Sequence, residues 1–398
     1  MTDSTTTSTS APDRTAARLR PFGTTIFTEF SRLALEHDAV NLGQGFPNFD
    51  GPEFIKRAAK DAIDAGHGQY ARMFGIPALN RAIADRFMLD CGIDVDPEAE
   101  ITVTSGCTEA IAASMLGLVD PGDEVILFEP YYDSYRATVA MAGGIAKFIT
   151  LRPPDFAVDP DELRRAFSAK TKAILINTPH NPTGKVFSRA EMELIAGLCR
   201  EYDCLAITDE VYEHLVFEGE HIRMATLEGM RERTVTLSSL GKTYSLTGWK
   251  IGWAIAAPEL TRGVRSAHQF LTFATATPLQ HGAVAALKAD QSYLDEFIAQ
   301  YRGWRDLLVD GLSRIGFEVY PPAGTYFVLA DHTPFGFKSD VEFCRHLVKE
   351  VRVAAIPPSA FYNDPADGRN FVRFAFCKTE ETLREALRRM EEGLKVTN

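Results

Sequence analysis

Between residues 51 and 296, short apolar runs alternate with segments of helical periodicity. The runs are apolar throughout rather than at every second position, which is typical of strands buried on both faces. Alternation of such strands with helices predicts an α/β fold in which a mostly parallel sheet lies between helices. The predicted strands are 101–104, 125–128, 146–151, 173–177, 205–208, 234–237 and 251–256.

The pattern changes after residue 296. A long helical segment leads into short strands and a final charged amphipathic helix, which predicts a second, smaller α+β domain. The first residues are rich in Ser and Thr and lack an apolar signal core, so they predict a disordered tail. We therefore expect a tail at 1–17, an arm joining the small domain at 18–50, a large domain at 51–296 and a small domain at 297–398.

Charge and composition disfavour several classes of protein. The formal net charge is −12, whereas a nucleic-acid-binding protein needs a concentrated basic surface. No apolar run reaches the roughly 18 residues of a membrane span. The six cysteines form neither a C-x-x-C pair nor a zinc spacing, so we expect no metal and a reducing, cytoplasmic location. The motifs G-x-G-x-x-G and H-E-x-x-H are also missing, which argues against a nicotinamide dehydrogenase and a metal hydrolase.

Polar residues follow several of the predicted strands. In parallel α/β sheets, ligands bind beyond the carboxyl ends of the strands. The first strand ends in T-S-G-C-T-E-A and runs directly into a helix, whose N-terminus attracts anions. There Gly106 allows close approach, and Cys107 and Thr108 offer N–H groups and a hydroxyl. An ordinary structural turn is the alternative interpretation.

An aromatic ring, an amide and an acid follow three other strands. Tyr132, in E-P-Y-Y-D-S-Y, offers a flat face for stacking, although a packed core ring is the alternative. Asn181 is held between prolines in T-P-H-N-P-T-G, which also reads as a plain turn. Asp209 ends a buried strand and therefore needs a cation nearby. Tyr212 follows three residues later; a capping Asp with a packed Tyr is the competing interpretation.

The stretch S-S-L-G-K-T-Y-S-L-T-G-W-K-I-G-W places Lys242 and Lys250 among small residues after another strand. A lysine held near an anion site is suited to bond covalently to an aldehyde, although most lysines are solvated surface charges. Taken together, the strand ends provide an anion cradle, a stacking ring, an amide, a carboxylate, a phenol and an amine. Pyridoxal 5′-phosphate requires this set of groups.

With these motifs the chain resembles the fold-type I aminotransferases of classes I and II. Within them it is similar to the kynurenine aminotransferase/glutamine transaminase branch and to bacterial methionine and N-succinyldiaminopimelate aminotransferases. The resemblance covers nearly all of residues 18–396. It implies a seven-stranded, mostly parallel sheet in the large domain and a homodimer with shared active sites. The motifs that carry it are N-L-G-Q-G-F-P-N-F, Q-Y-A-R-M-F-G, N-P-T-G, T-D-E-V-Y-E-H-L, the lysine stretch and V-R-F-A-F-C-K.

The resemblance also implies a role for each site residue. Lys242 would bond to the cofactor aldehyde and move the substrate proton, Asp209 would pair with the ring nitrogen, and Tyr132 would stack on the ring. Tyr212 and Asn181 would bind the ring oxygen. The phosphate would be held by Gly106, Cys107, Thr108, Ser239 and Lys250, and by Tyr70 of the other subunit. The substrate site would contain Arg373, which clamps the α-carboxylate, with Gly45 and Asn181 close by.

The substrate is less closely defined by the sequence. The segment 268–278, which the resemblance brings to the partner's site, contains no arginine of the kind that dicarboxylate-specific relatives use. Phe27 and Phe273 predict an apolar pocket, so we expect an aromatic amino acid, methionine or glutamine as amino donor to a 2-oxo acid. The alternatives are an N-succinyldiaminopimelate or aspartate-type aminotransferase, for which Arg72 could bind a distal carboxylate, and a cysteine-S-conjugate β-lyase.

Overall fold

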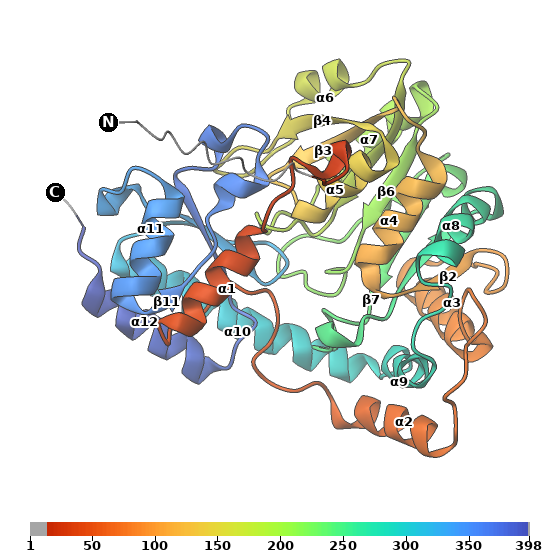
Figure 1. The fold of residues 1–398 in the computed structure, drawn as a ribbon, viewed down its shortest axis with the longest axis horizontal. Coiled ribbons are helices and arrows are strands. Elements are labelled where there is room, and N and C mark those ends of the chain that lie inside the picture. The colour runs from red at the N-terminus through yellow and green to blue at the C-terminus, as the bar shows by residue number, and fades with distance from the viewer. Residues whose placement is uncertain (1–13, 397–398) are drawn as a thin grey trace, which may run out of the picture.

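A computed structural model of the protein describes residues 14–396 (Figure 1). Residues 1–13 of the predicted tail at 1–17 lie outside the described residues. Among the residues that are described, no helix has both the length and the apolar character needed to cross a bilayer.

A seven-stranded sheet forms the centre of the molecule, in the order β2-β8-β7-β6-β5-β3-β4. Only β8 runs antiparallel to its neighbours, β2 and β7; all other adjacent pairs are parallel. The α/β fold with a mostly parallel sheet is therefore confirmed. The strands are β2 (Ile101–Thr104), β3 (Glu124–Glu129), β4 (Ile145–Thr150), β5 (Thr171–Asn177), β6 (Leu205–Asp209), β7 (Thr234–Ser239) and β8 (Gly252–Ala256).

Helices cover both faces of this sheet because alternate apolar residues of each strand point in opposite directions. In β3, Val125 packs in one core with α4 (Gly106–Leu118), α5 (Asp133–Ala142) and α8 (Pro258–Leu271). Its neighbour Ile126 packs in another core with α6 (Pro160–Ala166) and α7 (Arg189–Glu201). Three further helices are α2 (Glu53–Asp64), α3 (Pro77–Cys91) and α9 (Thr277–Leu287), of which α2 and α3 both contact α9.

The C-terminal part of the chain builds two smaller sheets. One is antiparallel, with the order β12-β10-β9, and the other pairs β1 with β11 in parallel. The pairing of β1 joins the N-terminal arm to the C-terminal part, while the predicted domain boundaries remain predictions. The elements are α1 (Ile26–Glu36), β1 (Val40–Asn41), α10 (Gln291–Ile315), β9 (Glu318–Tyr320), β10 (Phe327–Asp331), α11 (Asp340–His346), β11 (Val353–Ala354), β12 (Phe371–Ala375) and α12 (Glu380–Gly393).

The register of the central strands determines which polar residues meet. Asn177, the last residue of β5, lies directly beside Asp209, the last residue of β6. Asp209 in turn lies beside Leu237 of β7, which ends two residues later at Ser239. Polar groups far apart in the sequence are therefore gathered at one edge of the sheet.

Candidate active site

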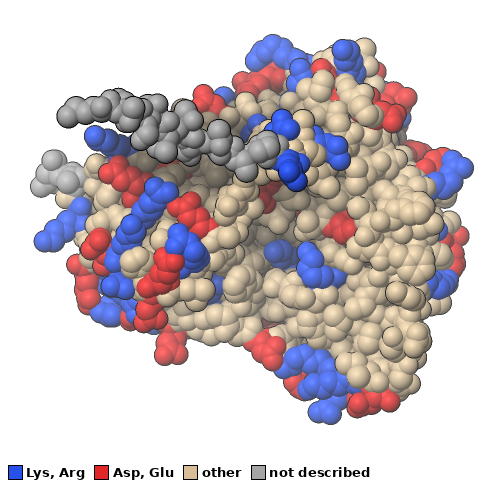
Figure 2. All heavy atoms as spheres, in the orientation of Figure 1, with Lys and Arg blue, Asp and Glu red and all other residues tan. Residues whose placement is uncertain are grey.

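A cavity of about 430 Å³ opens at this edge of the sheet. The face in view in Figure 2 is hollowed near its centre, where Lys or Arg side chains are exposed. Every predicted site residue lines the cavity except Tyr70 and Phe273. Those that do are Phe27, Gly45, Gly106, Cys107, Thr108, Tyr132, Asn181, Asp209, Tyr212, Ser239, Lys242, Lys250 and Arg373.

Asp209 is a buried carboxylate, 4% exposed. It accepts hydrogen bonds from the Tyr135 hydroxyl (2.6 Å), the Val211 N–H (3.3 Å) and the Cys107 thiol (3.5 Å). No cation forms an ion pair with it within residues 14–396. Burial raises the pKa of Asp209, and the Tyr135 hydrogen bond opposes this effect. A buried acid with only neutral donors is suited to receive a cationic group of a ligand.

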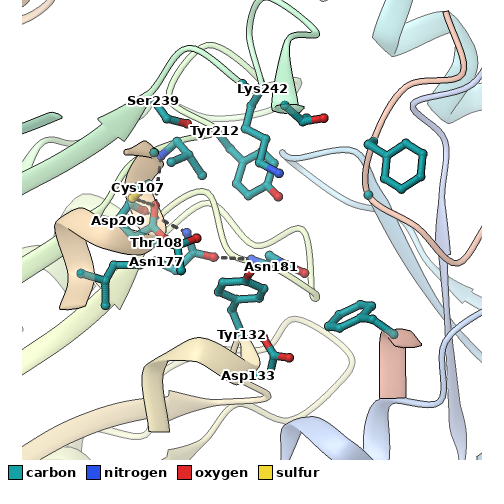
Figure 3. Close-up of a pocket in the computed structure, with 18 of the residues that line it drawn as sticks. Cys107, Thr108, Tyr132, Asp133, Asn177, Asn181, Asp209, Tyr212, Ser239 and Lys242 are labelled. Carbon is teal, nitrogen blue, oxygen red and sulfur yellow. Dashed lines mark hydrogen bonds between the residues drawn. The ribbon is translucent and has the colours of Figure 1, made fainter. Parts of the chain in front are cut away.

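A chain of side-chain amides connects Asp209 to Arg373. Asn177 donates its amide N–H to the carbonyl of Asp209 (2.9 Å) and accepts the backbone N–H of Asn181 (2.7 Å) (Figure 3). Asn181 in turn accepts a hydrogen bond from Arg373 Nη1 (3.1 Å). The chain holds Asn181 in the cavity wall between the acid and the guanidinium.

Lys242 extends from the segment after β7 into the cavity, toward the hydroxyl of Tyr212 and opposite Tyr132 (Figure 3). Its Nζ lies 5.6 Å from the ring centres of both Tyr212 and Tyr326. Burial lowers the pKa of Lys242, although the charge of Asp209 opposes the shift. A lowered pKa increases the fraction of neutral amine, which is the nucleophilic and basic form. Burial also holds the pKa of the Tyr212 phenol well above its usual value.

The N-terminus of α4 forms the anion end of the cavity. Gly106 has a φ of +76°, and a Cβ at this position would lie 3.3 Å from Nζ of Lys250. The glycine therefore leaves room for the lysine over the first turn of the helix, where backbone N–H groups are unpaired. The thiol of Cys107 points toward Asp209 and away from this anion site. Cys107 can therefore bind an anion here through its backbone N–H.

Arg373, in β12, is 2% exposed and has no carboxylate partner in the described part of the chain. It donates to Asn181 and, through Nη2, to the carbonyl of Gly43 (3.0 Å), while its Nε has no partner there. The rings of Phe327 and Phe27 lie 4.2 and 5.1 Å from the guanidinium carbon. Burial lowers the pKa of Arg373 to about 10. The site fits a bound carboxylate.

Tyr70 and Phe273 lie outside the cavity, and their rings contact each other edge to face at 5.5 Å. Tyr70 is 86% exposed. The predicted role of both residues depends on a second subunit, so within one chain it stays a prediction. Arg72 is not free for a distal carboxylate in this chain, because both its Nη atoms bind Glu98, at 2.7 and 3.2 Å.

Several residues of the site were missed by the sequence reasoning. Tyr135 donates to Asp209, and Asn177 contacts both Asp209 and Asn181. Asn177 is the last residue of β5, and Tyr135 lies in the motif E-P-Y-Y-D-S-Y, at the start of α5. Asp133 and Gln44 line the cavity without having been predicted. Tyr326 bonds through its hydroxyl to the carbonyl of Gly45 (2.6 Å). No local motif marks Tyr326, because its contact joins residues 281 positions apart.

The family model for aminotransferases of class I and II matches residues 37–390. The chain belongs to the class I and II aminotransferases. This confirms the predicted family and its activity, the transfer of an amino group between amino acids and oxo acids. Members of the family use pyridoxal phosphate.

Three relatives indicate where the aminotransferase stands within the family. The probable N-succinyldiaminopimelate aminotransferase of Mycobacterium tuberculosis is 48% identical over 388 residues, which cover 94% of this chain and 98% of the relative. The solved structure of N-succinyldiaminopimelate aminotransferase from that organism matches with a TM-score of 0.93, over 95% of this chain and 99% of its own. Methionine aminotransferase of Escherichia coli is 41% identical over 377 residues, 94% of this chain and 97% of the relative. Human kynurenine–oxoglutarate transaminase 1 is 38% identical over 391 residues, 90% of this chain and 93% of the relative.

Proposed function

We propose that this aminotransferase binds pyridoxal 5′-phosphate in the cavity and acts on L-amino acids with neutral side chains. The buried carboxylate of Asp209 carries the cofactor proposal, because it has no cationic partner within residues 14–396 and shares the cavity with Lys242. A protonated pyridine nitrogen would supply the cation that this acid lacks. Tyr132, on the same cavity wall, offers a ring for stacking.

The other groups of the cavity match the remaining parts of the cofactor. Lys242 would hold the aldehyde carbon, and Tyr212 and Asn181 would bind the ring oxygen. The phosphate would lie at the N-terminus of α4, where the charge of Lys250 and the helix N–H groups both favour an anion. Ser239, Cys107 and Thr108 would add neutral donors at the same place.

Pyridoxal phosphate, when bound, supplies an aldehyde that bonds to amines and a cationic ring that withdraws electrons from the substrate Cα. Lys242 then has a second role, because its amine can take the proton from Cα when it is neutral. Burial favours that neutral form. Asp209, as an anion, keeps the ring nitrogen protonated. Arg373 holds the substrate α-carboxylate and thereby orients Cα toward the amine of Lys242.

The character of the cavity wall supports a neutral substrate side chain. Phe27, Phe46 and Phe327 line the cavity. Among the described residues, its only cations are those assigned above to the cofactor and the α-carboxylate: Lys242, Lys250 and Arg373. Asp133 adds a carboxylate to the same wall, which disfavours a second acidic group on the substrate. Aromatic amino acids, methionine and glutamine meet these conditions.

N-succinyldiaminopimelate is the second candidate substrate. It is favoured by the 48% identity to the Mycobacterium tuberculosis relative over nearly the whole chain. This substrate carries acidic groups away from the reacting centre. The described residues of one chain provide no further cation in the cavity to bind them. Residues of a second subunit would have to bind them.

We further propose a homodimer with shared active sites. An apolar surface groove lies between α4 and α8, lined by Leu116, Phe270 and Leu271 among others. Phe270 is 84% exposed and lies three positions before Phe273, which contacts the exposed Tyr70. Apolar surface of this kind is typical of subunit interfaces. The six cysteines are all free thiols, which supports a reducing, cytoplasmic location.

One spectrum and one substrate panel test the proposal. The purified protein should show the visible absorbance of covalently bound pyridoxal phosphate, and Lys242→Ala should lose it together with about 10⁴-fold or more of its turnover. Lys170→Ala, at an exposed lysine, is the control. Normal turnover in Lys242→Ala would contradict the assignment.

The panel should include phenylalanine, methionine, glutamine, aspartate and N-succinyldiaminopimelate as donors. We expect the neutral side chains to give the highest kcat/KM. Aspartate as the best donor would overturn the neutral-pocket proposal, and N-succinyldiaminopimelate as the best donor would establish the second candidate. Pyruvate release from a cysteine S-conjugate, compared with amino transfer, measures β-elimination at the same site.

A further inference from the structure

The loop of residues 43–46 forms part of the cavity wall, and each of its four carbonyl groups accepts a side-chain hydrogen bond from the C-terminal part of the chain. No other part of the wall is held in this way along consecutive peptide groups in the described residues. The bonds run from Arg373 Nη2 to Gly43 O (3.0 Å), Lys378 Nζ to Gln44 O (3.1 Å), Tyr326 Oη to Gly45 O (2.6 Å) and Lys378 Nζ to Phe46 O (2.6 Å).

Lys378 is the least expected member of this set. Its side chain is 3% exposed, and no carboxylate pairs with it within residues 14–396. The ammonium is satisfied by two carbonyl groups and by the ring of Phe46, whose centre lies 5.0 Å away. Burial lowers the pKa of Lys378. A buried cation without a counter-ion is costly for stability, so packing alone gives no reason for a lysine at this position.

The carbonyl contacts determine where the N–H groups of the loop point. In a trans peptide unit, the C=O of one residue and the N–H of the next are antiparallel. By holding the carbonyl of Gln44, Lys378 therefore turns the N–H of Gly45 the other way. Gln44, Gly45 and Phe46 line the cavity, whereas Lys378 and Tyr326, which hold their carbonyls, do not. The N–H of Gly45, which points away from Lys378, is therefore directed to the cavity side.

The N–H groups of the loop fall into two pairs. Those of Gly43 and Gln44 donate to Asn41 Oδ1, at 2.9 and 3.1 Å. Those of Gly45 and Phe46 have no acceptor among residues 14–396. Gly45 is also tightly enclosed, because a Cβ there would lie 2.7 Å from Cζ of Phe327. Unpaired donors in a rigid wall beside Arg373 are suited to an anion.

We propose that Lys378 is a positioning residue for the α-carboxylate of the substrate: it clamps the carbonyls of Gln44 and Phe46, so that the N–H of Gly45 faces the carboxylate held by Arg373. This inference rests on the proposed function, since it takes the α-carboxylate to be the anion at Arg373. It predicts that Lys378 acts on substrates through their carboxylate and leaves the binding of the cofactor unchanged.

The test compares ligands with and without a carboxylate. L-phenylalanine and 2-phenylethylamine differ only in this group, and single-turnover changes in cofactor absorbance report on both. Lys378→Met removes the hydrogen bonds to the carbonyls of Gln44 and Phe46. It should lower kcat/KM for L-phenylalanine about 10-fold, mainly through KM, because the hydrogen bond from the Gly45 N–H to the substrate carboxylate is lost or misaligned. The rate with 2-phenylethylamine should stay within about twofold of the parent. Equal losses with both compounds would overturn the proposal.

Binding of 3-phenylpropanoate, a carboxylate without an amine, measures the same subsite without turnover. Lys378→Met should weaken its Kd about 10-fold while the Kd of pyridoxal phosphate is unchanged. Lys378→Gln keeps a neutral N–H donor in a similar volume and should recover most of this loss. Phenylpropanoate binding as weak in Lys378→Gln as in Lys378→Met, or a weakened cofactor, would refute a positioning role.

Lys185→Met is the matched control, because the side chain of Lys185 is only 8% exposed and its Nζ pairs with Glu191 (2.8 Å) away from the cavity. It should bind phenylpropanoate like the parent. The two proposals fail in different ways. A parent protein without cofactor absorbance contradicts the proposed function, whereas a loaded Lys378→Met protein with normal phenylpropanoate binding contradicts the role of Lys378 alone.

Discussion

At the scale of single residues, two buried charges stand out in the cavity. Asp209 and Arg373 are 4% and 2% exposed, and neither has an ion-pair partner in the described chain. Burial disfavours the charged form of each, raising the pKa of the acid and lowering that of the guanidinium. Such groups reduce stability until a ligand brings the opposite charge, so their arrangement is explained by binding rather than by folding.

Tyr135→Phe tests the strongest support of Asp209, the 2.6 Å hydrogen bond from its hydroxyl. The variant leaves one carboxylate oxygen without its donor, so the free energy of unfolding should fall by about 2 kcal/mol. The hydrogen bond lowers the pKa of Asp209, so its loss raises that pKa further. The acid limb of the kcat–pH profile should therefore move to higher pH.

Tyr131→Phe is the control for this change, because Tyr131 is also buried and its hydroxyl accepts a single long hydrogen bond of 3.4 Å, from Arg136, among the described residues. It should leave the acid limb in place. An acid limb that is the same in Tyr135→Phe and in the parent would show that Asp209 does not control it.

At the scale of secondary-structure elements, His268 connects three segments of the site. From α8, its Nδ1 lies 2.5 Å from the carboxylate of Glu109 in α4, and its Nε2 lies 2.7 Å from the carbonyl of Met73. Both neighbours are acceptors, so the arrangement favours an imidazole that donates from both ring nitrogens and carries a positive charge. Met73 belongs to the segment that carries Tyr70. The ion pair therefore joins α4, whose N-terminus is proposed to bind the phosphate, to a segment predicted to reach the other subunit.

The pH dependence of stability tests this connection. Burial by itself lowers the pKa of His268, and the charge of Arg265 lowers it further. The hydrogen bond and the charge of Glu109 outweigh both effects, so the pKa is raised above its ordinary value of 6.5. The protonated His268 therefore contributes its full stabilisation of the folded protein below about pH 6.5, the pKa of histidine in the unfolded chain. This contribution is lost as the pH rises through the pKa of His268 in the folded protein. Urea unfolding at pH 6 should show His268→Gln less stable by about 2 kcal/mol, a difference that shrinks at alkaline pH.

His67→Gln, at an exposed histidine, should show no such trend. A stability difference between His268→Gln and the parent that stays constant from acid to alkaline pH would rule out a charged His268.

At the scale of the whole molecule, one chain contains most of the proposed site but not all of it. Tyr70 and Phe273 form an exposed surface outside the cavity, and Phe270, three positions before Phe273 in the sequence, is exposed as well. A second copy that covered this surface would bury these rings and bring them to a neighbouring site. The cavity within one chain would then be only the larger share of the complete active site.

Subunit mixing tests whether the sites are shared. Lys242→Ala and Tyr70→Ala should each be nearly inactive as homodimers if Tyr70 serves the partner's site. In a mixed dimer, one site carries both substitutions and the other carries neither. Refolding the two variants together should therefore restore activity above that of either alone, and size-exclusion chromatography should show a dimer throughout. Activity that stays at the level of the separate variants would contradict shared sites.

Much of the fold was predictable, because short-range patterns carry it. Apolar runs of strand length predict buried parallel strands wherever they occur, and the polar residue after each run falls at the ligand-binding edge of such a sheet. Asp209, Asn181 and Lys242 could thus be singled out from their positions at strand ends. The predicted strand 251–256 begins one residue later, as β8 (Gly252–Ala256), and nothing in its composition marked it as antiparallel.

The remaining contacts depend on tertiary structure, since they join segments with no common pattern. Gly43 and Arg373 are separated by 330 positions, and Lys378 and Phe46 by 332. Apolar periodicity decides which residues are buried, but it does not decide which buried donor meets which acceptor; that depends on strand order, register and the packing of the C-terminal part on the N-terminal arm. The amino-acid sequence alone therefore determined the sheet, the family and the chemical groups at the strand ends. Only the tertiary structure decided how Asn177, Tyr135 and Lys378 hold those groups, because hydrogen bonds depend on distances and directions that a linear pattern does not contain.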